Sequence, residues 1–400
     1  TTLLNTGVLT LGNHADDSIT FVGGLDTTSG LSPMTLAGTV ATTNTAMDLG
    51  AVTLAADGTL ASGSGQVTTG GVTDGANSYT LTLGEAGQSG AFALQGNVTV
   101  GTLATVAETY DVSLTGGANV IDTDTTFSNT GVLTLGDQVT DSSTFTGGLT
   151  ATAVDQVVLG GGTVATTNAN LTLGDANAEA VSVTADSTLT AGTGTIDLGD
   201  TVLSDDVTLT LGDGSATPIA MDAIAGTADN GSSNLTFNTT GAVTVAESVG
   251  TDIGTLTVTQ SGGATFGAAV NAATVTLTDT TGTVAFEGDT TITTALTTAA
   301  EDYALSFTGE SNIIAGDTTL LNTGTVTLGN HADDSTTFTG GLDATAASST
   351  TVAGTVATTD NAMVLGAVTL AANGTLRSGS GAITVASVAG GTTHGLTLQA

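Results

Sequence analysis

Short stretches of the chain alternate between hydrophobic and polar residues. In residues 8–11 (VLTL) and 207–211 (VTLTL), leucine would lie on one face of a strand and threonine on the other. Glycine, asparagine and aspartate follow many such stretches, and these residues tolerate the positive φ angles of tight turns. Strands roughly a dozen residues apart, with turn residues between them, are typical of all-β proteins. We find no convincing helical stripe, and we therefore expect an all-β fold.

A longer pattern repeats along the chain. The sequence NTGVLTLGNHADDSITFVGGL at residues 5–25 returns with small changes at residues 129–149 and 322–342. Residues 37–65 are also nearly repeated at residues 353–381. Internal repeats of this kind indicate an array of similar structural units in which each unit contacts only its neighbours.

The repeats divide the chain into three superunits, at approximately residues 5–128, 129–321 and 322–400. The second superunit is longer than the first, and a stack of coils tolerates the insertion of whole coils. We predict one continuous β-solenoid over residues 1–400. Because the chain begins inside one repeat and ends inside another, we expect it to be a segment of a larger protein.

Two all-β architectures compete for this pattern. Tandem immunoglobulin-like sandwiches would need a core built around a residue such as tryptophan, but the chain has no Trp, and a long insertion would disrupt a sandwich. A β-solenoid is compatible with both facts. We expect a right-handed parallel β-solenoid (β-helix) built from imperfect repeats, following the handedness of parallel β connections. Two or three strands per coil would give coils of roughly 24–38 residues.

The composition is consistent with a narrow core. The chain has 57 Gly and 2 Pro, is 39% hydrophobic but only 3% aromatic, and has a mean hydropathy of +0.32. This hydrophobic content is sufficient to bury a core, whereas a compact globule would use more large side chains. We expect the few large side chains at Tyr110, Tyr303, Phe145 and Phe338 to lie in the core or to cap it.

The charge is strongly one-sided. Arg377 is the single basic residue against 37 acidic residues, which gives a formal net charge of −36. This balance excludes nucleic acid as a partner and also excludes electrostatic attachment to anionic lipid. The carboxylates must be hydrated, spread apart or bridged by cations. The chain has no Cys, and it shows no signal peptide, membrane-spanning run or lipidation motif.

Residues 7–25, GVLTLGNHADDSITFVGGL, resemble the autotransporter-associated β-strand repeat. The sequence TFTGG at residues 144–148 and 337–341 resembles the second half of that repeat, with Phe where the family favours Tyr. Residues 263–286 resemble secreted bacterial β-helix proteins of the filamentous-haemagglutinin type. The resemblance implies a right-handed β-helix in an extracellular or cell-surface bacterial protein, and it implies no catalytic residues. The strong acidity is a departure from it.

Paired aspartates are the first candidate site. Asp16 and Asp17 occupy the same turn of equivalent repeats as Asp333 and Asp334, each pair after an Asn-His sequence. Oxygen-rich turns can bind Ca²⁺, which takes 6–8 oxygen ligands, but a solvated turn also selects aspartate. The EF-hand spacing and the glycine-rich calcium nonapeptide are absent, and loose divalent binding by the whole acidic surface is a further alternative. Similar acidic turns occur at Asp122, Asp124, Asp205 and Asp206.

Other chemistries have weaker support. A transition-metal site needs several converging ligands, so His14, His331 and His394 are interpreted as loop residues. Polysaccharide lyases of the β-helix fold typically use Arg or Lys, and Arg377 is the only such residue. A glycoside hydrolase needs only two carboxylates, but sugar clefts are usually lined by aromatic side chains. We therefore predict that the chain is not an enzyme.

Ice binding is a further alternative for the threonine-rich strands. A regular Thr-x-Thr sequence at the same place in every coil would indicate a flat ice-binding face. In the sequence these pairs look scattered, for example at residues 278–280 and 291–293. Threonine on the exposed face of a strand is the simpler interpretation.

These observations predict a non-catalytic structural stalk or fibre segment of a large secreted or surface-displayed bacterial protein that resembles an adhesin. Its partners would be further repeats of the same longer chain, and it could associate with itself into a filament or surface layer; the sequence does not identify a receptor. The sequence points to no certain cofactor, and calcium is the candidate ion. Unpaired strands at the ends should make the isolated segment prone to aggregate. The alternative is a β-helical polysaccharide-active enzyme, a lyase or a glycosidase.

Overall fold

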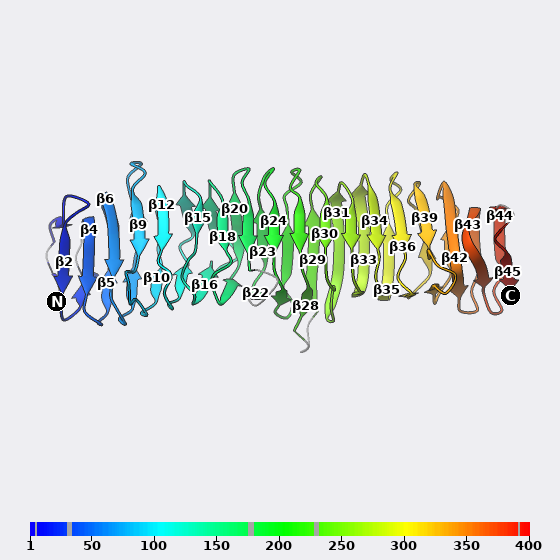
Figure 1. Cartoon of the computed structure of the whole chain (residues 1–400), viewed down its shortest axis with the longest axis horizontal. Helices are drawn as coiled ribbons and strands as arrows, with labels where there is room; N and C mark the ends of the chain where they lie inside the picture. Colours follow the sequence, from blue (N-terminus) through cyan, green and yellow to red (C-terminus); the bar gives the residue numbers. More distant parts are fainter. Residues whose placement is uncertain (5, 30–33, 175–179, 228–231, 391–392) are drawn as a thin grey trace. The chain divides into compact units, whose positions relative to one another are not determined.

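The computed structural model describes residues 1–4, 6–29, 34–174, 180–227, 232–390 and 393–400. Asn5, the first residue of the first repeat, lies outside these ranges. Within them the chain is all-β, with parallel strand pairing and no helix (Figure 1). The contacts divide it into two units, Thr1–Thr201 and Val202–Ala400, which are described separately. β25 (Thr201–Leu203) lies at the boundary.

In unit 1, successive strands join three ladders, each a series of strands paired in parallel. Ladder A contains β1 (Leu9–Leu11), β4 (Met34–Thr42), β6 (Val52–Ala61), β8 (Val72–Thr73), β11 (Val98–Val100), β14 (Ala118–Ile121), β17 (Ser142–Phe145), β20 (Gly162–Thr166) and β23 (Ser187–Thr190). Ladder B contains β2 (Ser18–Phe21), the ends of β4 and β6, β9 (Thr80–Leu83) and β12 (Thr102–Thr105), and a further run of β15 (Thr125–Thr126), β18 (Leu149–Ala151), β21 (Leu171–Leu173) and β24 (Ile196–Leu198). Ladder C contains β3 (Leu25–Asp26), β5 (Met47–Leu49), β7 (Val67–Thr69), β10 (Phe92–Leu94), β13 (Val112–Leu114), β16 (Val132–Leu135), β19 (Gln156–Leu159) and β22 (Ala180–Val183).

Unit 2 is built in the same way. Ladder D contains β27 (Ile219–Met221), β30 (Val243–Val245), β32 (Ala264–Phe266), β34 (Thr283–Phe286), β36 (Ala304–Phe307), β39 (Thr325–Leu328) and parts of β42 (Ser349–Thr358), β43 (Met363–Arg377) and β44 (Ile383–Ala389). Ladder E contains the starts of β33 (Val270–Thr280) and β35 (Thr290–Thr298), then β37 (Ser311–Ile314), β40 (Ser335–Phe338), the ends of β42 and β43, and β45 (Leu396–Gln399). Ladder F contains β26 (Thr208–Leu211), β29 (Ser233–Asn238), β31 (Ile253–Ser261) and later parts of β33 and β35, and a further run of β38 (Thr318–Thr319), β41 (Leu342–Ala344) and the starts of β43 and β44. β28 (Ile224–Gly226) makes an isolated bridge from Ile224 to Val249.

The expected parallel β-solenoid is therefore confirmed in both units. The expected coil length is only partly right. Paired residues one coil apart are separated by 26 positions between Leu209 and Leu235 but by only 18 between Leu36 and Leu54. The shorter coils arise because one strand can bend and serve two ladders: β4 turns at Gly38, where its pairing register with β6 shifts.

The core is a narrow stack of aliphatic and aromatic side chains. Tyr110, Tyr303, Phe145 and Phe338 are all buried, as the sequence predicted. In unit 2, the ring of Phe286 stacks on Phe266 and Phe307, with centroid distances of 5.0 and 4.9 Å. Inward residues thus pack against their equivalents in the next coil, and outward residues alternate with them, as in β26.

Candidate functional site

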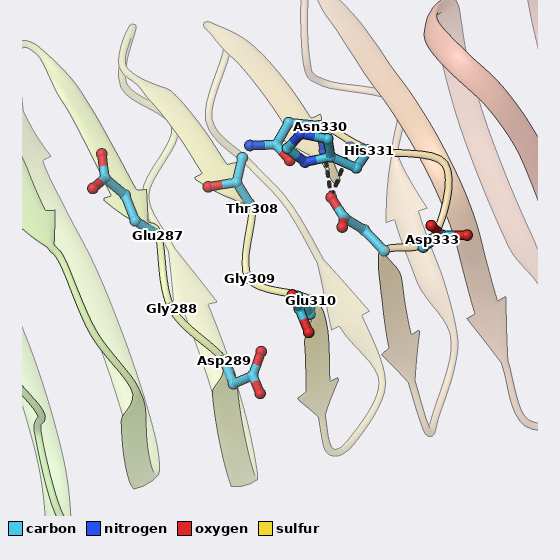
Figure 2. Close-up of a pocket in the computed structure, with 10 residues that line it drawn as sticks. Glu287, Gly288, Asp289, Thr308, Gly309, Glu310, Asn330, His331 and Asp333 are labelled. Carbon is cyan, nitrogen blue, oxygen red and sulfur yellow. Dashed lines mark hydrogen bonds between the residues drawn. The ribbon is translucent and has the colours of Figure 1, made fainter.

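Unit 2 contains an acidic groove of about 680 Å³ at one corner of the coils. Three turns from successive coils form it: 287–289 after β34, 308–310 after β36, and 330–334 after β39. Figure 2 shows these turns side by side. The residues that line it are Glu287, Gly288, Asp289, Thr308, Gly309, Glu310, Asn330, His331, Asp333 and Asp334.

Glycine allows the turns to stack closely. A Cβ atom at Gly309 would collide with the carbonyl oxygen of Gly288 in the preceding coil. The backbone also connects the coils, because the amide of Thr308 donates to the carbonyl oxygen of Phe286 at 2.9 Å. The amide of Gly329 likewise donates to the carbonyl oxygen of Phe307 at 2.8 Å. The groove therefore follows from the stacking of short corners.

Two of the five carboxylates in the groove hold the backbone. Oδ2 of Asp334, whose side chain is only 4% exposed, accepts the amides of Asn330 at 2.7 Å and His331 at 2.9 Å (Figure 2). Oδ1 of Asp289 accepts the amide of Ser311 in the next coil at 2.9 Å. These side chains fix the geometry of the turns.

The other three carboxylates, of Glu287, Glu310 and Asp333, are exposed. In Figure 2, Glu287 and Asp333 lie at opposite sides of the groove with Glu310 between them. Within the described residues, no three His, Cys, Asp or Glu side chains are grouped closely enough to hold one metal ion. The arrangement can concentrate cations along the groove and accept hydrogen bonds from hydroxyl groups.

The predicted calcium residues divide into two kinds. Asp17 and Asp334 are turn residues: Oδ2 of Asp17 accepts the amides of Asn13 at 2.8 Å and His14 at 3.1 Å, as Asp334 does in the last repeat. Those two backbone hydrogen bonds lower the pKa of Asp17 below its usual value. Asp16 and Asp333 are exposed. The calcium site stays a prediction, and each pair offers it one carboxylate that the turn does not use.

The middle repeat shows which of these residues the turn requires. Its equivalent of Asp17 and Asp334 is Asp141, whose Oδ2 accepts the amides of Asp137 at 2.9 Å and Gln138 at 3.0 Å. Although Asp137 is exposed, slight desolvation, and then the neighbouring carboxylate of Asp141, raise its pKa. The equivalent of Asp16 and Asp333 is Thr140. The second aspartate is therefore present in all three copies and the first is not.

The remaining candidates do not converge. His14, His331 and His394 are exposed, and Nδ1 of His14 lies 2.8 Å from Oδ1 of Asn13. Oδ1 of Asp205 accepts the hydroxyl of Thr227 at 2.7 Å. Exposed side chains are also found at Asp122, Asp124 and Asp206.

Sequence reasoning missed Glu287, Asp289 and Glu310. Each of them lies just after the end of a strand, at the same corner of its coil. This shared position was the signal in the sequence that could have identified them. In unit 1 the residue equivalent to Asp289 is not an acid: Oδ1 of Asn97 accepts the amide of Ala118 at 3.0 Å, in the role that Asp289 has with Ser311. The turn therefore does not require a carboxylate at this position.

The described residues contain no helix that is long and apolar enough to cross a membrane. Comparison with protein-family models, with curated proteins and with solved structures gives no match for this chain.

Proposed function

We propose that this chain is a structural stalk or fibre segment of a large secreted or surface-displayed bacterial protein that resembles an adhesin. One observation carries the proposal: the repeated copies agree at residues that support the backbone and differ at exposed positions of the same turn. Asp17, Asp141 and Asp334 are equivalent and hold two amides each. Exposed His14 and His331 are Gln138 in the middle copy.

A second pair of equivalents supports the same interpretation. The buried side chain of Asn119 donates to the carbonyl oxygen of Gly116 at 3.0 Å and accepts the amide of Val98 at 2.9 Å. Asn312 does the same with Gly309 and Thr290, at 3.0 and 3.2 Å. Because each of these side chains connects one coil to the previous one, repetition of them preserves stacking. A stack of this kind extends by whole coils without a new core design.

The partners in this proposal are further repeats of the same longer chain, and self-association would give a filament or a surface layer. The net charge of −36 would keep such a structure hydrated outside the cell. Calcium is proposed to bind loosely to the acidic surface, including Asp16 and Asp333. Calorimetric titration with Ca²⁺ tests this: the heat of binding should change little in a D16N/D333N variant, whereas loss of a saturable site would indicate specific binding there.

Immunogold electron microscopy of the source cells tests the main proposal. An antibody raised against the purified chain should label thin projections or a surface layer, and cells that lack the gene should show no label. Label that is found only in the medium, with none on any surface structure, would contradict a stalk or fibre.

The acidic groove favours a second candidate, a β-helical polysaccharide-active enzyme. Glu287, Glu310 and Asp333 are exposed carboxylates that a glycosidase could use. A panel of polysaccharides incubated with the wild-type chain and with the E310Q variant tests it. Release of reducing ends by the wild type and not by the variant would favour an enzyme over a structural segment. No release by either protein would count against the enzyme.

A further inference from the structure

The structure brings threonines that are irregularly spaced in the sequence into a regular array on ladder F of unit 2. Thr210 pairs with Thr236, Thr236 with Thr257, Thr257 with Thr276, and Thr276 with Thr297. Five successive strands, β26, β29, β31, β33 and β35, therefore carry threonine at the same position. Most of these strands are labelled side by side in Figure 1.

A second row lies two residues earlier on the same strands. It contains Thr208, Asn234, Thr255, Thr274 and Ala295, and its members are also paired in order. Residues two apart in a strand point to the same face. The two rows together form an array of five strands by two positions, and eight of the ten positions are threonine.

The register of the array is regular. The pairing shifts that accompany β29 fall outside Asn234–Phe237, and the shift between β33 and β35 falls before Thr274. Neighbouring strands are about 4.8 Å apart and alternate residues about 6.6 Å apart, so the side chains form a two-dimensional lattice. The β-branch of threonine restricts χ1, which keeps the hydroxyl and methyl groups in fixed positions.

The array lies on a layer of buried core side chains. The residues between the two rows are Leu209, Leu235, Leu256, Val275 and Leu296, and all of them are buried. The threonines alternate with them and are partly or fully exposed on the outer face. The array contains no charged side chain, although the chain has 37 acidic residues. It is thus an uncharged, regular patch on a strongly acidic protein.

We propose that the threonine array of ladder F binds ice. A fixed lattice of hydroxyl and methyl groups can order water molecules at the spacings of the lattice, in two directions. This ordered water can then join the surface of an ice crystal. A charged side chain would instead hold its own hydration shell. The array contains no charged side chain. On ladder E, the corresponding row of outward-facing residues is interrupted by Ile313 and Arg377, so it lacks the same regularity.

Partition of the full chain into slowly growing ice tests the proposal. The wild type should become enriched in the ice fraction and should inhibit ice recrystallisation. The double substitution T257K/T276K places two charged side chains at the centre of the array and should abolish both effects. The double substitution T236K/T255K should give the same loss of ice partition and of recrystallisation inhibition. Agreement between the two variants excludes the misfolding of one variant as the cause.

The matched control is T337K. Thr337 is also an outward-facing, half-buried threonine in unit 2, but it lies on ladder E between Ile313 and Ala357. This variant should keep the ice partition of the wild type, with circular dichroism used to confirm that every variant is folded. Exclusion of the wild type from ice, or an equal loss in T337K, would overturn the proposal.

Discussion

The carbonyl oxygen of Asp334 accepts the amide of Thr355 in the next coil at 2.7 Å. The same contact joins Asp17 to Thr39 at 2.7 Å and Asp141 to Thr163 at 2.8 Å. Each aspartate thus holds its own turn through its side chain and the following coil through its backbone. The aspartate is present in all three copies of the repeat, and in each copy it makes both the turn contacts and the contact with the next coil.

Removal of the Asp334 side chain should destabilise the protein. The D334A variant loses a buried acceptor for two backbone amides, which should lower the free energy of unfolding by about 1–3 kcal/mol. Exposed Asp333 is the matched control, and D333A should change the urea midpoint little. Equal midpoints for the two variants would show that the side chain of Asp334 does not support the turn.

A side chain at Gly354 should also be costly. Gly354 has a φ of +69°, and a Cβ atom there would collide with the carbonyl oxygen of Asp334. Left-handed backbone for a residue other than glycine costs on the order of 1–3 kcal/mol, and the collision adds to it. Gly366 in the same unit has only ordinary contacts around its Cβ position. Thermal denaturation should therefore show a clear loss for G354A, and a G366A variant with the same loss would contradict the steric argument.

The two equivalent tyrosines should respond differently to loss of the hydroxyl group. The hydroxyl of Tyr110 donates to the carbonyl oxygen of Leu83 at 2.7 Å and accepts the amide of Val106 at 2.9 Å. The buried hydroxyl of Tyr303 forms no hydrogen bond of comparable geometry, and its contacts with the backbone of Ala299 and the side chain of Thr298 are weaker. Y110F should lose about 1–2 kcal/mol of stability, whereas Y303F should be close to neutral. A larger loss in Y303F would reverse this interpretation.

The same tyrosines predict a weakness at high pH. Burial raises the pKa of both Tyr110 and Tyr303 to about 12, whereas an unfolded tyrosine has a pKa of about 10. Between these two pH values, the tyrosines of the unfolded state lose their protons while those of the folded state keep them. The contribution of these tyrosines to the free energy of unfolding is therefore fully present below about pH 10 and falls as the pH rises towards 12. The loss should approach about 2–3 kcal/mol per tyrosine. Urea midpoints at a series of pH values should fall less steeply for Y303F, and an unchanged slope would contradict this account.

Some of these features were accessible from the sequence. The alternation of Thr208 and Leu209 predicted correctly that they lie on opposite faces of the strand, with Leu209 buried, and the aligned positions of Tyr110 and Tyr303 predicted core residues. The groove was not predicted, because Asp289 and Glu310 become neighbours only when the coils stack. The threonine array was missed for a related reason. Because the coils differ in length, the paired threonines are separated by 26, 21, 19 and 21 positions from Thr210 to Thr297.

One coil is the structural unit of this chain, and removal of one coil tests this most directly. Phe266 and Phe286 are paired in register, so deletion of residues 266–285 joins Thr265 to Phe286 and leaves equivalent residues in every ladder. Deletion of residues 266–275 instead joins Thr265 to Thr276 and removes only part of a coil. The first variant should keep its circular dichroism spectrum and a urea midpoint close to that of the parent, while the second should lose cooperative unfolding. Equal loss of stability in the two variants would show that the coil is not the structural unit.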